Sequence, residues 1–174
     1  MGIEPNAIYG PLWSPGDIVK RLHGVTARQI LDLAEKGLIT PSRETTGAGS
    51  PRLYDFRNVF EICVCLAIRG RIPAGTAALG LTRAIINFIH VTALKEAVKV
   101  KDPILGIPPS LEGPPPFDLL LIVCDDRQNY MYYGVSYGQT FGEILGSTKR
   151  YKPQNYCSYT IEVSALWSYL KGIF

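Results

Sequence analysis

The sequence predicts an α+β protein in two parts. Residues 14–100 place apolar residues mainly at helical spacing. Residues 102–117 hold six prolines and two glycines, which exclude a helix or a central strand and indicate a semi-rigid linker. Beyond the linker, apolar and aromatic runs bounded by turn residues are typical of strands. We therefore expect four segments: an N-terminal domain at 1–72, a helical connector at 73–101, the linker at 102–117 and a small α+β domain with an antiparallel sheet at 118–174.

The first predicted helix begins after Ser14. Ser14 is a favourable cap, and Pro15 suits the first helical position. Asp17 lies three residues after the cap, where its negative charge meets the positive end of the helix dipole. Gly24 is expected to end this helix, which is therefore short.

A second short helix is predicted directly after the first. Thr26 is its expected cap, and Gln29 three residues later completes a capping box. Gly37 is expected to end it. Two short capped helices separated by a glycine-centred turn predict a helix-turn-helix.

The region after this pair is predicted to be a loop and a third helix. The loop covers residues 40–51, and Arg43 and Arg52 flank its flexible centre. Following a helix-turn-helix, these two arginines suggest contacts with phosphates, although solvated arginines of a surface loop are the simpler alternative. The third helix is expected over residues 55–69, with Asp55 as its cap and a wide apolar face.

Three stretches of this region resemble the MerR-type winged helix-turn-helix. That family typically carries a G-V-[ST]-x-R start of the second helix, an E-K-x-G-L-[IL]-x-P exit into the wing and an R-x-Y before the third helix. The chain departs from the pattern at Leu31-Asp32-Leu33, where the family usually carries an arginine followed by aromatic residues. The matching stretches are Gly24-Val25-Thr26-Ala27-Arg28, Glu35-Lys36-Gly37-Leu38-Ile39-Thr40-Pro41 and Arg52-Leu53-Tyr54-Asp55.

This resemblance, which covers about the first 70 residues, implies a regulator that binds double-stranded DNA. The start of the second helix would then reach base edges in the major groove, with Arg28 suited to guanine and Gln29 to adenine. Other residues would hold backbone phosphates beside the groove. The candidate DNA-binding residues are Lys20, Thr26, Arg28, Gln29, Arg43, Arg52 and Tyr54.

The connector at 73–101 is predicted to be helical, with a break at Gly80. Its apolar residues occupy two faces, and both faces have to be buried. One face can cover the N-terminal domain, whereas the other needs the C-terminal part or a second subunit. We predict a homodimer that reads a palindromic site, with an interface formed by Leu81, Ile85, Phe88 and Ile89.

The C-terminal part is predicted to contain a β-hairpin of residues 119–124 and 130–137, a third strand at 158–163 and a closing helix at 164–170. Twelve of the 18 aromatic residues lie from Phe117 onward. In an extended strand, Tyr130 and Tyr132 face one way and Tyr133 and Tyr137 the other. Both sets cannot fill one small core, so one set should face a pocket, a subunit interface or solvent.

Effector binding in the C-terminal part is what the family resemblance implies. A planar or cationic ligand could stack on the aromatic rings there. The candidate pocket residues are Tyr130, Tyr132, Tyr133, Tyr137, Tyr159 and Trp167.

Composition excludes several classes of function. A net charge of +3 is too small for a bulk cationic coat of nucleic acid, so DNA binding would need a local basic patch. The sequence shows no signal-peptide pattern and no apolar stretch of the roughly 18 residues that span a membrane. We therefore expect a cytoplasmic protein with no membrane partner.

Catalytic and metal-binding patterns are also missing from the sequence. The histidines are His23 and His90, neither lies near a serine or cysteine nucleophile in sequence, and no glycine-rich phosphate loop is present. We expect no enzyme activity, no cofactor and no metal site. The four cysteines form no CxxC pair, which fits buried free thiols, with a metal or redox sensor as the alternative.

The sequence therefore predicts a DNA-binding transcriptional regulator with a C-terminal domain that senses a small molecule or docks a protein. The alternative is an interaction module that uses a helix-turn-helix-like fold to bind protein without specific DNA binding.

Overall fold

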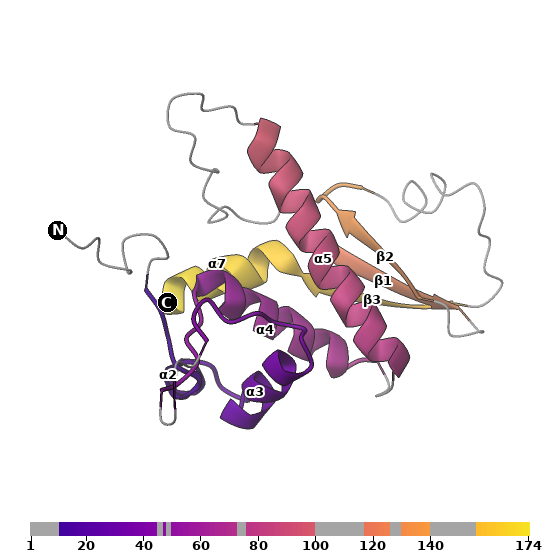
Figure 1. Ribbon diagram of the computed structural model, residues 1–174. Coiled ribbons are helices and arrows are strands. Elements are labelled where there is room, and N and C mark those ends of the chain that lie inside the picture. The colour runs from indigo at the N-terminus through magenta and orange to yellow at the C-terminus, as the bar shows by residue number, and fades with distance from the viewer. Residues whose placement is uncertain are drawn as a thin grey trace. The chain divides into compact units, whose positions relative to one another are not determined.

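The computed structural model describes residues 11–44, 47, 50–72, 76–99, 117–125, 130–139 and 156–174 (Figure 1). The chain divides into two compact units. The first comprises Met1–Ile86 together with Leu170–Phe174, and the second comprises Asn87–Tyr169. The predicted linker, apart from Phe117, lies outside the described residues. Helices and a three-stranded antiparallel sheet are both present, which confirms the α+β class.

The first unit begins with two short helices, α2 (Pro15–Arg21) and α3 (Ala27–Glu35). Each carries a complete capping box, as the sequence predicted for α3. At α2, the Ser14 hydroxyl accepts from the Asp17 N–H at 3.2 Å, and the Asp17 carboxylate accepts from the Ser14 N–H at 3.1 Å. Gly24 in the connecting turn has a φ of 78°, a left-handed conformation that glycine adopts without strain.

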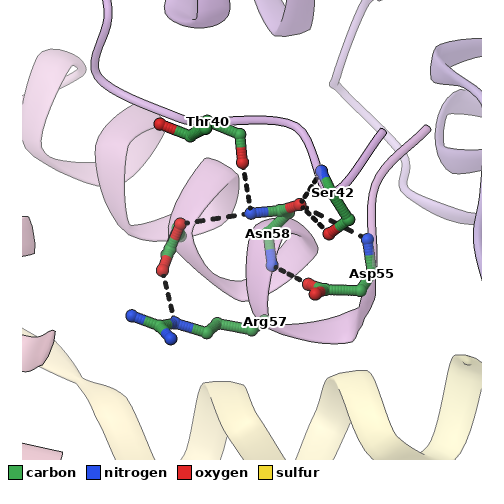
Figure 2. Close-up of polar contacts among 6 residues, drawn as sticks. Thr40, Ser42, Asp55, Arg57 and Asn58 are labelled. Carbon is green, nitrogen blue, oxygen red and sulfur yellow. Dashed lines mark hydrogen bonds and ion pairs between the residues drawn. The ribbon is translucent and has the colours of Figure 1, made fainter. Parts of the chain in front are cut away.

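Helix α4 (Phe56–Arg69) begins after the predicted cap Asp55 and supplies much of the core of the first unit. Its Asn58 is buried and joins two loops to the helix (Figure 2). Asn58 Oδ1 accepts from the Ser42 N–H at 3.1 Å and from the Ser42 hydroxyl at 2.7 Å, and Asn58 Nδ2 donates to the Thr40 carbonyl at 3.0 Å. This network satisfies buried polar groups that would otherwise destabilise the fold.

Two short antiparallel bridges hold the loops of the first unit. Arg43 and Leu53 exchange backbone hydrogen bonds of 3.1 and 2.9 Å, which closes the loop predicted between the second and third helices. Trp13 and Tyr54 exchange bonds of 2.8 and 2.9 Å, which ties the segment before α2 to the segment before α4. The Arg43–Leu53 bridge therefore holds the two ends of this loop side by side.

Helix α5 (Thr76–Lys99) runs without interruption through Gly80, so the predicted break at this residue is wrong. A single glycine costs a helix only about 1 kcal/mol relative to alanine, which the surrounding 24-residue helix tolerates. The helix passes from the first unit into the second after Ile86. In the first unit, Arg83 Nη2 donates to the Lys36 carbonyl at the end of α3, at 3.0 Å.

The second unit contains strands β1 (Leu119–Asp125), β2 (Tyr130–Val135) and β3 (Tyr156–Glu162), in the order β2-β1-β3. Both pairings are antiparallel, with Leu119 opposite Val135 on one side and Glu162 on the other. The predicted hairpin and third strand are therefore confirmed. In the central strand β1, the apolar residues Leu120 to Cys124 are buried, so side chains on both faces of this strand are enclosed.

Helix α7 (Val163–Ile173) follows β3 directly, as predicted, and crosses from the second unit into the first. Its end is fixed within the first unit. The Arg21 guanidinium donates to the Ile173 carbonyl at 3.1 Å, and the Phe174 ring meets the Trp13 ring edge-on with centroids 4.9 Å apart. The last residues therefore pack with the N-terminal helices, whereas the sequence analysis placed residues 118–174 in one domain.

Candidate nucleic-acid interface

The first turn of α3 presents three of the predicted base-reading residues at the surface. Thr26, Arg28 and Gln29 are all exposed. Gln29 Oε1, however, accepts from the Thr26 N–H at 2.8 Å and from the Thr26 hydroxyl at 3.0 Å. Bidentate reading of adenine needs this oxygen, so Gln29 would have to leave the capping box first. Arg28 is thus the most accessible base-reading candidate of the three.

The predicted phosphate-binding cations differ in how much they are engaged. The Lys20 side chain is 81% exposed and lies 3.9 Å from Asp17, and Arg43 is exposed beside the bridged loop. Arg52 Nε donates to Glu44 Oε2 at 3.0 Å across the same loop. A phosphate would have to replace Glu44 to receive the full charge of Arg52.

Tyr54 is not a surface residue, and its assignment to DNA contact is therefore wrong. It is one of the largest fully buried side chains, because the bridge to Trp13 directs this part of the chain into the core. Burial raises the pKa of Tyr54. Its hydroxyl has no hydrogen-bond partner among the described residues. Tyr54 is therefore a core residue of the first unit.

An open depression of about 630 Å³ lies beside the exposed start of α3. The connecting turn, α3 and the end of α4 all contribute to its lining. It contains three cationic side chains and one carboxylate, so its net charge is positive. The lining residues are Gly24, Val25, Thr26, Arg28, Gln29, Asp32, Lys36, Leu66, Arg69 and Gly70.

Asp32 is at the centre of the charges in this depression. Its carboxylate lies 2.7 Å from Lys36 Nζ, one helical turn later in α3, and 2.7 Å from Arg69 Nη1 at the end of α4. Hydrogen bonds from Lys36 and Arg69 lower the pKa of Asp32 below its ordinary value. The carboxylate is therefore ionised at neutral pH and is shared by two cations.

Lys36 and Arg69, like Asp32, were not among the predicted site residues. The spacing of Asp32 and Lys36 is a recognisable i,i+4 ion pair, so the sequence carried a signal for this contact. Arg69 lies 37 residues from Asp32, and no sequence pattern indicated their contact.

The predicted dimer residues are already buried within one chain. Leu81, Ile85 and Ile89 are 8, 0 and 5% exposed. Phe88 is half-buried, with its ring 5.5 Å from the rings of both Phe117 and Tyr132. The apolar character of these four residues is thus explained without a second subunit, and the homodimer stays a prediction.

The predicted pocket residues are spread over the second unit. Tyr132 and Tyr133 are neighbours on β2 and so lie on opposite faces of the sheet. Tyr133 packs against Leu121, Val123 and Val135, and Tyr132 contacts Phe88. The six residues cannot line one pocket together, because strand alternation separates them. Trp167 is buried and Tyr137 is 61% exposed, whereas Tyr130 and Tyr159 are half-buried.

In the described part of the chain, no group of three or more histidine, cysteine or acidic residues is arranged to hold a metal ion. No described helix combines the length and apolar character needed to cross a membrane. The four cysteines are present as thiols; Cys65 and Cys124 are buried, Cys63 is half-buried and Cys157 is exposed.

No protein-family model and no curated protein matches this sequence. The function has to be inferred from the residues and the geometry of the chain itself.

Proposed function

We propose that the first unit is a winged helix-turn-helix that binds double-stranded DNA, with α3 as the recognition helix and the bridged loop at 43–53 as the wing. The observation that carries this proposal is the exposed Arg28 on the first turn of α3, beside a depression with net positive charge. An arginine in this position suits bidentate contact with guanine in the major groove. The MerR-like motifs support the same assignment.

The wider role we propose is regulation of transcription, with the second unit as a sensing or docking domain. A dimer reading a palindrome would need contact surfaces beyond Leu81, Ile85 and Ile89, because one chain already buries them. Sedimentation equilibrium of the full chain at micromolar concentration tests this: a dimer supports reading of a palindrome, and a monomer counts against it.

DNA binding is tested by fluorescence anisotropy with random duplex DNA at several salt concentrations. We expect binding that weakens steeply with salt, since released counterions drive it. Arg28→Ala should cost about 1–3 kcal/mol at one base position and relax sequence preference. Arg28→Lys is the matched control, because it keeps the charge but loses the bidentate fork. Arg52→Ala should weaken all sequences alike and flatten the salt slope.

A protein-interaction module is the second candidate function. It is favoured by two carboxylates that neutralise cations of the first unit, Asp32 on α3 and Glu44 in the loop. Equal, salt-insensitive behaviour of wild type, Arg28→Ala and Arg52→Ala would reject DNA binding and leave the interaction module as the better explanation.

A further inference from the structure

Asp32 forms ion pairs with two of the three cationic side chains that line the depression beside α3. Lys36 Nζ lies 2.8 Å from Asp32 Oδ2 and 2.7 Å from Oδ1, and Arg69 Nη1 lies 2.7 Å from Oδ2. The third cation, Arg28, lies on the lining of the same depression. A single carboxylate therefore holds two positive side chains at the place where the proposed recognition helix would meet DNA.

These ion pairs can exchange partners at little cost. The side chains of Lys36, Asp32 and Arg69 are 37, 34 and 32% exposed, so water screens their attraction. Ion pairs this exposed are weak. An incoming oxyanion can therefore compete with Asp32 for both cations.

The chemistry of the depression fits a phosphate diester. The Arg69 guanidinium can bind phosphate oxygens through two parallel N–H donors, and Lys36 supplies a compact positive charge. Both are within reach of one oxygen-bearing group, because the two already share the Asp32 carboxylate. Two of the lining residues, Gly24 and Gly70, are glycines, which have no side chain to obstruct a nucleic-acid backbone.

We propose that Lys36 and Arg69 form a seat for a DNA backbone phosphate, and that Asp32 is a built-in competitor that sets the strength and salt dependence of binding there. The inference rests on the proposed DNA-binding function and deepens it. Asp32 keeps the two cations oriented in the free protein and gives them up when a phosphate enters. The negative charge of Asp32 also repels the DNA backbone, and Asp32 therefore opposes non-specific binding.

The test is the salt dependence of duplex binding by full-length Asp32→Asn, measured by fluorescence anisotropy. The amide keeps the size and an acceptor oxygen but removes the charge. We expect binding about three- to ten-fold tighter than wild type at low salt. The slope of log affinity against log salt should become steeper by about one, since removal of the Asp32 charge leaves one more positive charge to neutralise phosphate.

Glu35→Gln is the matched control. It removes one negative charge from the same helix, but Glu35 is exposed and does not line the depression. We expect less than a two-fold change in affinity and an unchanged slope. An equal gain in both variants would show a long-range charge effect and overturn the proposal, as would wild-type affinity in Asp32→Asn.

A second pair of variants, Lys36→Gln and Arg69→Gln, tests the seat independently of Asp32. When either substitution is added to Asp32→Asn, the slope of log affinity against log salt should be shallower than in Asp32→Asn alone. If wild type binds duplex DNA and these slopes do not change, the phosphate seat is rejected while the proposed function stands. If neither wild type nor Asp32→Asn binds duplex DNA, both are rejected. Circular dichroism confirms that each variant is folded.

Discussion

The elements of the two units are defined by contacts that span different distances along the sequence. In the first unit, α2, α3 and α4 each begin with a capping box formed by residues three positions apart. In the second unit, β1 pairs with β3, so that Leu119 meets Glu162 and Cys124 meets Cys157. Helix ends are therefore fixed locally, whereas the sheet depends on contacts across a long intervening segment.

The difference extends to what each unit exposes. The first unit displays a cationic depression beside an exposed helix start. The second uses its apolar and aromatic residues mainly for packing, as Tyr132 and Tyr133 show on opposite faces of β2.

Cysteine reactivity gives the largest expected contrast between the units. Burial in α4 raises the pKa of Cys63 to about 12 and also raises the pKa of Cys65, whereas Cys157 on β3 is exposed. A raised pKa keeps the thiol protonated, and only the thiolate reacts. At pH 8 iodoacetamide should modify Cys157 about a thousand-fold faster than Cys63. Peptide mass spectrometry measures both rates, and similar rates would contradict the raised pKa of Cys63.

Core truncations test whether the units unfold separately. Leu33→Ala in the first unit and Leu120→Ala in the second each remove a fully buried side chain. Each should lower the free energy of unfolding by about 2–5 kcal/mol. The two tryptophans report on different units, because Trp13 lies in the first and Trp167 in the second.

The measurement is urea unfolding followed by fluorescence, with Leu33→Ala studied in Trp167→Phe and Leu120→Ala in Trp13→Phe. Each core variant should also be measured with the other reporter, where its effect should be small. If a core variant lowers the free energy of unfolding equally with both reporters, the chain unfolds as one cooperative unit, which would contradict separate unfolding of the two units.

Removal of the Asn58 side chain tests the polar network of the first unit. Asn58→Ala leaves the Ser42 N–H and the Thr40 carbonyl without their partner (Figure 2). The expected loss is about 2–3 kcal/mol in the free energy of unfolding. Asn87→Ala is the control, because Asn87 is exposed on α5 and its loss should be nearly neutral. Equal stability of the two variants would contradict the role of the network.

Two glycine substitutions give the smallest expected effects, with opposite signs. A Cβ at Gly134 would lie 2.7 Å from the buried Phe117 ring, so Gly134→Ala should destabilise the second unit by about 2 kcal/mol. A Cβ at Gly80 would meet nothing within 4 Å, and Gly80→Ala should stabilise α5 by about 0.5–1 kcal/mol. Thermal unfolding measures both. Stabilisation by Gly134→Ala would show that the Phe117 ring moves freely.

Much of the fold was predictable because its signals are local. Ser14, Thr26 and Asp55 were identified as caps, and all three act as caps in the structure. The hairpin and the third strand were located from their apolar runs and turn residues. The break at Gly80 failed because helix packing outweighs the propensity of one residue.

The candidate site was predictable only in part. The exposed start of α3 followed from the capping pattern, and Arg28 is accessible as expected. Tyr54 was misplaced because a motif match cannot tell a surface aromatic residue from a core one. Its burial depends on the bridge to Trp13, which lies far from it in sequence.

The sequence by itself determined the starts of α2, α3 and α4, the approximate strand positions and the α+β class, because these depend on residues within a few positions of one another. Only the tertiary structure decided which polar groups far apart in the sequence meet. It joins Asp32 to Arg69 across 37 residues and Arg21 to the Ile173 carbonyl across 152. The physical reason is that a salt bridge or hydrogen bond needs atoms within about 3–4 Å, and for distant residues that distance is set by packing of the core.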